Sequence, residues 1–279
     1  MKIKSKKLRI FLSRKISVLA ALVLVLMTFA AFAGPYMTSR SPYEQDISLR
    51  FEGISREHWL GTDYIGRDMF TRIIHGGQIS MGIALFGVTI GVVIGLLLGF
   101  LSGYYSGITD SIISRFIDML MAIPGLMIAT ITVAILGSGG INTGIAVGLS
   151  TIPSFMRMTR ASVISIKETD YVKSCRIIGV SDIRIIMTHI MPGVLPLIAV
   201  TFTLNLGTAL LIASSLSYLG IGVNPPTPEW GALLSSGRHM MLSWPLGVIA
   251  PGIAITLFVL CTSLVGDGLR DAFDPKSIE

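Results

Sequence analysis

The sequence predicts an all-α, polytopic membrane protein with six transmembrane helices. Composition is the first indication: 52% of the 279 residues are hydrophobic and only 14% are charged, whereas a soluble domain carries about 25% charged residues. The second is a set of six long apolar runs, since a helix of about 20 apolar residues crosses a bilayer. The third is the charge of the segments between the runs, which agrees with six crossings.

Residues 1–15 are expected to be a basic, cytoplasmic N-terminus. A basic cluster can bind nucleic acid or anionic lipid, but directly before a membrane helix it indicates a cytoplasmic anchor. No nucleic-acid partner is therefore expected, and the lipid bilayer is. Seven of the 22 basic residues lie in this segment: Lys2, Lys4, Lys6, Lys7, Arg9, Arg14 and Lys15.

Residues 16–36 are expected to form the first transmembrane helix. The basic start, the apolar run and the small residues Ala31-Phe32-Ala33 also resemble a secretory signal peptide. The apolar stretch is longer than the ~7–15 residues usual in such signals, and further spans follow it. A retained helix is therefore favoured over a cleaved signal.

Residues 79–269 are expected to form a core of five further transmembrane helices. The apolar runs that predict them cover residues 79–104, 112–136, 141–158, 193–219 and 246–266.

Loop charge orients these spans under the positive-inside rule. With the N-terminus in the cytoplasm, the 159–192 loop and the C-terminal residues 270–279 are also cytoplasmic. The 159–192 loop carries five Lys and Arg against three Asp and Glu. Residues 37–78 and 220–245 fall on the extracytoplasmic side with net charges of −1 and zero.

Glycines recur every four or five residues in the second apolar run. Small residues at such spacing allow helices to approach closely in lipid, so helix packing is the favoured interpretation. A sliding surface used during gating is the alternative. The residues are Gly82, Gly87, Gly91, Gly95, Gly99 and Gly103.

The 159–192 loop reads as two short helices joined by a turn. Asp170 is suited to cap a helix over Tyr171–Ile178, and Gly179 is suited to end it. Ser181 or Asp182 can then start a second helix, which is expected to end before Pro192. An ordinary basic loop that only fixes topology is the alternative.

This loop resembles the signature of ABC importer permeases, in which a Glu-Ala-Ala triplet precedes a glycine, and twelve residues separate that glycine from a proline. Gly179 and Pro192 have this separation, and Lys173 takes the position of the glutamate, as is common in the peptide and nickel branch. A salt bridge of that glutamate is not carried over. The resemblance implies an ATPase-coupling loop that contains Asp170, Tyr171, Lys173, Ser174, Cys175, Gly179, Ser181, Arg184, His189 and Pro192.

Four other segments resemble the same branch, in the expected order along nearly the whole chain. They are His58 to Ser80, the RFIDMLMAIP stretch with Arg115, Asp118 and Pro124, Leu219 to Arg238, and Val265 to Pro275. The resemblance implies a type I importer fold and a second permease subunit. It also implies two ATPase subunits that use ATP and Mg²⁺, and an extracytoplasmic substrate-binding protein. It implies short peptides as cargo, with nickel or a metal chelate as the alternative.

The remaining polar residues within the spans have two interpretations each. Arg115 and Asp118 are spaced i, i+3 and are expected to pair on one helix face. Asn205 is expected either to line the translocation path or to bind a neighbouring helix. An ion-gradient transporter is a more distant alternative, which would require carboxylates in mid-span.

No catalytic residue, bound cofactor or metal site is expected in this chain. It contains no Gly-Lys dipeptide and therefore no GxxxxGK[ST] nucleotide loop, so ATP hydrolysis is expected on partner subunits. Its four histidines are not spaced with other ligands as in a metal site, and its two cysteines form no CxxC motif. A membrane enzyme or assembly factor would require polar residues clustered at one depth, which the sequence does not show.

Overall fold

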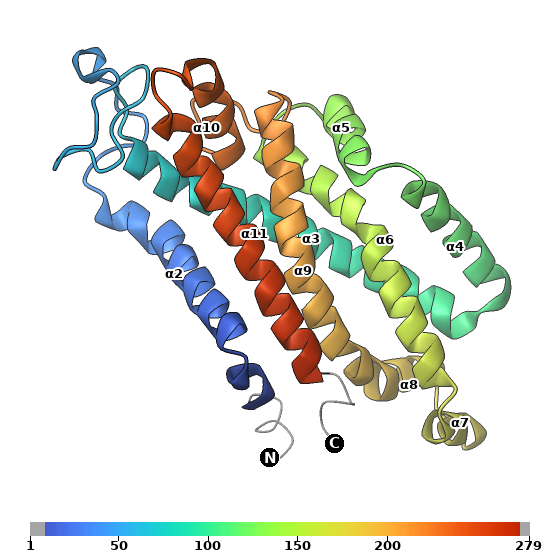
Figure 1. Cartoon of the computed structure of the whole chain (residues 1–279). Helices are drawn as coiled ribbons and strands as arrows, with labels where there is room; N and C mark the ends of the chain where they lie inside the picture. Colours follow the sequence, from blue (N-terminus) through green and yellow to red (C-terminus); the bar gives the residue numbers. More distant parts are fainter. Residues whose placement is uncertain (1–8, 274–279) are drawn as a thin grey trace.

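The apolar runs of the sequence form long helices that lie side by side (Figure 1). The structure is a computed structural model that describes residues 9–273. No β-strand occurs within those residues, where a single isolated bridge joins Thr62 and Asp68. The long helices are α2 (Lys15–Met37), α3 (Met69–Tyr105), α4 (Gly107–Met121), α5 (Gly125–Leu136), α6 (Gly140–Lys167), α9 (Met191–Tyr218) and α11 (Leu246–Phe273).

Shorter helices lie at the two ends of the bundle (Figure 1). One end, called the α7 end, carries α7 (Asp170–Ile177) and α8 (Asp182–Ile185). At the α7 end, Arg14 before α2 also forms an ion pair with Asp271 of α11. The opposite end, called the α10 end, carries α10 (Trp230–Gly237) and the irregular segment 38–68.

The six-helix count expected from the sequence is not confirmed. Within the described residues, four helical stretches are long and apolar enough to cross a membrane, and five if the bent pair of α4 and α5 is one span. The 28-residue α6 does not meet the same criterion. Its apolar residues are interspersed with Gly, Ser, Thr and basic residues, which lowers its mean hydropathy. Much of α6 packs against α3 rather than facing outward.

The 112–136 run is two helices rather than the single span expected. α4 and α5 are bent by 91° at a break of three residues. The break ends at Pro124, which is the N-cap of α5. Proline disfavours helical geometry in the residue before it and has no N–H to continue the helix, so the chain turns here.

The glycines of α3 allow it to pack closely against α6. A Cβ atom added to Gly95 would lie 2.6 Å from Cβ of Phe155, closer than real Cβ atoms approach. The packing interpretation is therefore confirmed for five of the six glycines, while Gly82 faces open space. The close pairs recur every fourth residue on both helices: Gly87–Val147, Gly91–Thr151, Gly95–Phe155, Gly99–Thr159 and Gly103–Val163.

At the α10 end, the segment expected as the 220–245 loop folds back onto the bundle. Glu229 is fully buried and caps α10 by accepting a hydrogen bond from the Ala232 N–H. Its carboxylate also accepts hydrogen bonds from Ser80 of α3, at 2.8 Å, and Ser214 of α9, at 3.3 Å. A buried carboxylate needs such partners, so Glu229 fixes α10 against two long helices.

The 38–68 segment, which belongs to the expected 37–78 segment, is held by buried charges. The Nε of Arg67 donates to Asp63 at 2.6 Å, and His58 contacts Asp68 at 2.9 Å. All four side chains are at least nine-tenths buried. These Arg, His and Asp side chains therefore hold the segment together. Residues 69–78 belong to α3 rather than to a loop.

Candidate functional site

The two short helices α7 and α8 project from the α7 end and are here called the elbow (residues 168–190; Figure 1). The expected two helices and turn are thus present. α7 begins at Asp170, with Thr169 as its N-cap, so the expectation that Asp170 caps the helix is wrong. Asp170 lies in the first turn instead, where its negative charge is favourable near the positive end of the helix dipole.

Gly179 ends α7 in the way its position in the sequence predicts. Its φ angle is +81°, a left-handed conformation that glycine adopts without a Cβ penalty. The N–H of Val180 donates to the carbonyl of Cys175 at 3.0 Å, and the N–H of Gly179 donates to Arg176 at 3.0 Å. These two bonds form a Schellman motif, which satisfies the last carbonyls of α7 and reverses the chain.

The second short helix was expected to end before Pro192, but this expectation is wrong. α8 continues through a π-helical turn, η2 (Ile186–Ile190), directly into α9. The N–H of Met191 donates to the carbonyl of Ile186, five residues earlier. Pro192 lies in the first turn of α9 and has no N–H to donate. The elbow is therefore a continuous helical extension of α9.

Tyr104, near the end of α3, connects the elbow to the bundle. Its hydroxyl donates to Oδ1 of Asp182 at 2.5 Å, and the Arg176 guanidinium lies 4.7 Å from the centre of its ring. The Lys167 ammonium donates to the Tyr104 carbonyl at 2.7 Å. Sequence reasoning missed Tyr104 as an elbow contact, because nothing in the signature motif points to a residue 78 positions before Asp182.

The inner face of the elbow is apolar and packed. Val172 of α7 and Ile185 and Ile190 of α8–η2 are completely buried. They pack against a cluster completed by Tyr104, Val163, Val194 and Ile198. Burying each aliphatic side chain stabilises this arrangement by ~1.5–3 kcal/mol.

The outer face of the elbow exposes isoleucines. Ile177 is 85% exposed, Ile178 76% and Ile183 73%. The three residues flank the Gly179 turn on both sides. A group of large aliphatic side chains that faces away from the protein is typical of an interaction surface.

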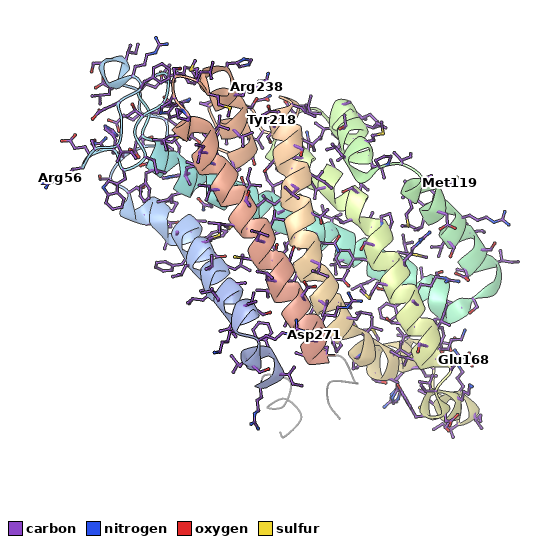
Figure 2. The ribbon with its side chains drawn as sticks, viewed as in Figure 1. Arg56, Met119, Glu168, Tyr218, Arg238 and Asp271 are labelled. Carbon is purple, nitrogen blue, oxygen red and sulfur yellow. The ribbon has the colours of Figure 1, made fainter. Side chains whose placement is uncertain are left out.

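Several predicted loop residues form local contacts in the elbow. Lys173 forms an ion pair with Glu168 at 3.1 Å, and both side chains are exposed. The hydrogen bond and charge of Lys173 lower the pKa of the Glu168 carboxyl. Figure 2 shows Glu168 at the α7 end of the molecule, far from Arg238 and Tyr218 at the α10 end. The hydroxyl of Ser174 donates to the Asp170 carbonyl at 2.9 Å.

The other predicted loop residues lie between the two helices or on α8. Cys175 Sγ is 3.7 Å from Nε2 of His189, and the His189 ring centre lies 6.4 Å from that of Tyr171. Ser181 is the N-cap of α8, without a side-chain cap bond. Arg184 accepts, through its carbonyl, a hydrogen bond from Thr188. All ten predicted residues therefore belong to the elbow or its junction with α9.

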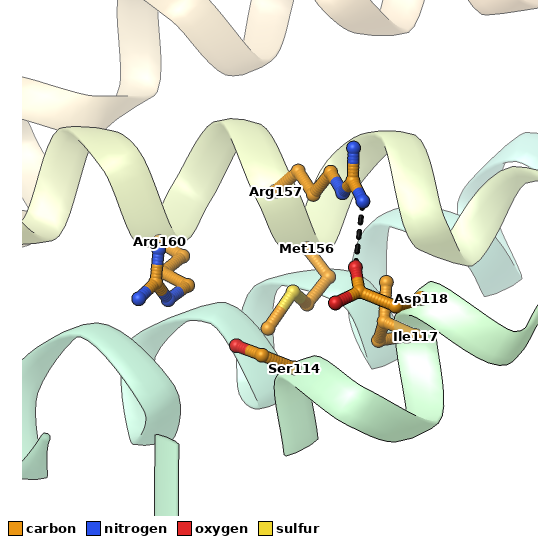
Figure 3. Close-up of a pocket in the computed structure, with 6 residues that line it drawn as sticks. All are labelled: Ser114, Ile117, Asp118, Met156, Arg157 and Arg160. Carbon is orange, nitrogen blue, oxygen red and sulfur yellow. Dashed lines mark hydrogen bonds and ion pairs between the residues drawn. The ribbon is translucent and has the colours of Figure 1, made fainter. Parts of the chain in front are cut away.

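A second polar region lies between α4 and α6. A cleft of 390 Å³ is lined by Ser114, Ile117, Asp118, Met156, Arg157 and Arg160 (Figure 3). Asp118 pairs with Arg157 of α6 at 2.6 Å, so the expected pairing of Asp118 with Arg115 is wrong. The i, i+3 spacing permits an intrahelical pair, but the guanidinium from the facing helix lies closer to the carboxylate.

Asn205 lies at the junction of α9 and α6. Its amide donates to the Thr201 carbonyl of its own helix at 2.8 Å and to Ser154 Oγ of α6 at 3.5 Å. It therefore has the contact with a neighbouring helix that one of its two interpretations requires. Among the described residues, no three His, Cys, Asp or Glu side chains gather closely enough to hold a metal ion.

Comparison with known sequences decides the family. Residues 91–279 match the family described as binding-protein-dependent transport system inner membrane component. The chain belongs to this family. It is 43% identical over 272 residues to the glutathione transport system permease protein GsiD of Escherichia coli O157:H7 and of Pectobacterium atrosepticum. The match covers 96% of this chain and 89% of each relative.

Solved structures support the same fold. The inward-facing MetNI methionine ABC transporter matches with a TM-score of 0.60 at 16% sequence identity, over 73% of this chain and 97% of that chain. An amino acid ABC transporter with histidines matches with a TM-score of 0.54 at 15% identity, over 70% of this chain and 91% of that chain. The fold is that of an ABC importer permease. This binding-protein-dependent permease is therefore a membrane-spanning transport component of the inner membrane.

Proposed function

We propose that this permease subunit forms, with a second related permease subunit, the pathway of an ATP-driven importer of short peptides. An extracytoplasmic binding protein delivers the peptide to the α10 end. Two ATPase subunits bind the elbow at the α7 end and use ATP and Mg²⁺. The chain itself performs no catalysis and binds no cofactor.

The exposed isoleucines of the elbow are the observation that carries the coupling role. Ile177, Ile178 and Ile183 project from the elbow, away from the long helices, where an ATPase groove can bury them. The rest of the elbow is fixed to α3 through Tyr104 and is continuous with α9. Closure of the ATPase dimer therefore displaces two long helices together and opens the pathway toward the binding protein.

Orientation follows from the same assignment. The α7 end, with the net positive segment 159–192 and both ends of the described chain, faces the cytoplasm. The α10 end, with the 38–68 segment and α10, faces outward. This agrees with the positive-inside rule, because residues 159–192 carry a net positive charge and residues 37–78 and 220–245 do not.

The peptide assignment rests on the glutathione permeases to which the chain is 43% identical. Glutathione is a small peptide, and short peptides are the corresponding substrate class. Nickel or a metal chelate is the alternative cargo within the same branch. The histidines offer little support for nickel, because His58 is buried against Asp68 and His239 contacts Arg238.

Uptake of a labelled dipeptide, of labelled glutathione and of ⁶³Ni²⁺ in cells with and without this gene tests the proposal. A gene-dependent loss of peptide uptake, with nickel uptake unchanged, is expected. Loss of nickel uptake alone would move the permease to the metal branch. Uptake of all three compounds without the gene would remove the peptide assignment.

A further inference from the structure

The helix α6 has two faces of different character. One face packs against the glycines of α3 through Val147, Thr151 and Phe155. The other carries Ser150, Ser154 and Arg157, spaced i, i+4 and i+7, which places them on one side of the helix. Ser154 and Arg157 are exposed, so a polar face of α6 is not covered by this chain.

Arg157 and Asp118 lie within the apolar runs 141–158 and 112–136, from which two of the spans are predicted. The Arg157 side chain is 52% exposed and the Asp118 side chain 59%. Charged groups that are exposed to lipid within a membrane span are costly and normally face a water-filled cavity instead. This side of the chain therefore faces water rather than lipid.

The cleft between α4 and α6 has the dimensions and chemistry of a small-molecule site. Its 390 Å³ falls within the ~300–1,000 Å³ usual for such sites. Asp118 and Arg157 place opposite charges 2.6 Å apart at its edge, and the buried side chains of Met156 and Ile117 lie beneath it (Figure 3). Arg160 is engaged elsewhere, since it makes two hydrogen bonds to Asp110 at 2.6 and 2.7 Å.

We infer that this cleft is a binding site for the zwitterionic backbone of the transported peptide, within the translocation pathway. The inference rests on the proposed peptide function and adds the residues that recognise the substrate. Arg157 binds the C-terminal carboxylate of the peptide, and Asp118 binds its N-terminal ammonium group.

The pair Asp118–Arg157 suits a site that must bind and then release. Without substrate the two charges satisfy one another, so neither is left unpaired. A zwitterionic peptide replaces this ion pair by two new ones with the same charges, and the net change in free energy is small. Weak binding of this kind permits passage toward the cytoplasm, whereas a tight site would trap the substrate.

Dipeptide binding to the assembled importer, without its binding protein, tests the inference. The probes are radiolabelled Ala-Phe, its C-terminal amide and its N-acetyl form, added to the complex in lipid nanodiscs. Arg157→Gln is expected to weaken binding of free Ala-Phe about tenfold and to leave binding of the amide unchanged. Asp118→Asn is expected to weaken binding of free Ala-Phe about tenfold and to leave binding of the N-acetyl form unchanged. Arg115→Gln, which removes a charge from α4 outside the cleft, is the matched control.

The outcomes separate this inference from the peptide function itself. Equal loss of all three probes in Arg157→Gln would show that the ion pair only holds α4 against α6, and would overturn the inference. Wild-type binding in both variants would overturn it as well. So would a wild-type complex that imports peptide with its binding protein but binds no probe without it. If the importer takes up no peptide at all, the proposed function itself is wrong. The cellular uptake assay detects that outcome independently of the binding measurement.

Discussion

The hydroxyl of Tyr104, one residue before the end of α3, donates a 2.5 Å hydrogen bond to Asp182, the first residue of α8. The bond joins the second long helix of the chain to the elbow, across 78 residues of sequence. The elbow is thereby attached to α3 by a side chain and to α9 by the backbone. A displacement of the elbow is transmitted to both helices.

Tyr104→Phe is expected to weaken this transmission. A hydrogen bond to a charged group contributes ~1.5–3 kcal/mol, so its loss changes the equilibrium between attached and detached elbow at least about tenfold. Peptide uptake by the reconstituted importer should fall severalfold while ATP hydrolysis continues. Tyr105→Phe is the control, because the hydroxyl of Tyr105 forms no hydrogen bond among the described residues. Equal effects of the two variants would argue against a specific role for the Tyr104 bond.

Gly179 is expected to tolerate no large side chain. Any L-residue at its φ of +81° is strained by ~1–2 kcal/mol, and a side chain there would project outward, since no atom of this chain lies within 4 Å of an added Cβ. Gly179→Trp should abolish uptake while the subunit remains in the membrane, because the ring enters the ATPase groove. Gly179→Ala measures the backbone strain alone and should retain part of the uptake. Normal transport by the tryptophan variant would remove the coupling assignment.

The local structure of the elbow could be read from the sequence because its determinants are local. A helix-forming run followed by Gly179 predicts a helix and its left-handed stop, and both are present. The continuation through Pro192 could not be predicted, because a proline is accommodated wherever a π turn or a first helical turn makes its missing N–H harmless. The bend at Pro124 could have been predicted from the sequence, because a proline followed by a glycine is typical of a turn.

Contacts between distant elements were not predictable in the same way. Asp118 has Arg115 three residues earlier, but its observed partner is Arg157, 39 residues away. The choice depends on how α4 packs against α6, and no spacing within α4 contains that information. Tyr104 was missed for the same reason. The coupling role is predicted through the family resemblance, whereas the exposed isoleucines became apparent only from the structure.

The exposed isoleucines are expected to contribute most of the ATPase binding. Burying an isoleucine in a partner groove contributes ~1.5–3 kcal/mol, and a carboxylate in its place would be desolvated there without a partner. The double variant Ile177→Asp/Ile178→Asp should lose copurification of the ATPase subunits. Ile54→Asp, at a residue 67% exposed in the 38–68 segment, should retain it. Retention of the ATPases by the double variant would place their docking surface elsewhere.

The packing of α3 on α6 gives a test that is independent of the proposed function. An alanine at Gly95 places its Cβ 2.6 Å from Cβ of Phe155 and 3.0 Å from the backbone of Ile152 and Met156, so the helices must separate. Such overpacking costs ~1–3 kcal/mol. Gly95→Ala should lower the melting temperature of the purified subunit in detergent by several degrees. Gly82→Ala, on the same helix but with no atom within 4 Å of the added Cβ, should leave the melting temperature unchanged or raise it, because alanine favours helix by about 1 kcal/mol. Equal melting temperatures for the two variants would show that the glycines of α3 do not determine its distance from α6.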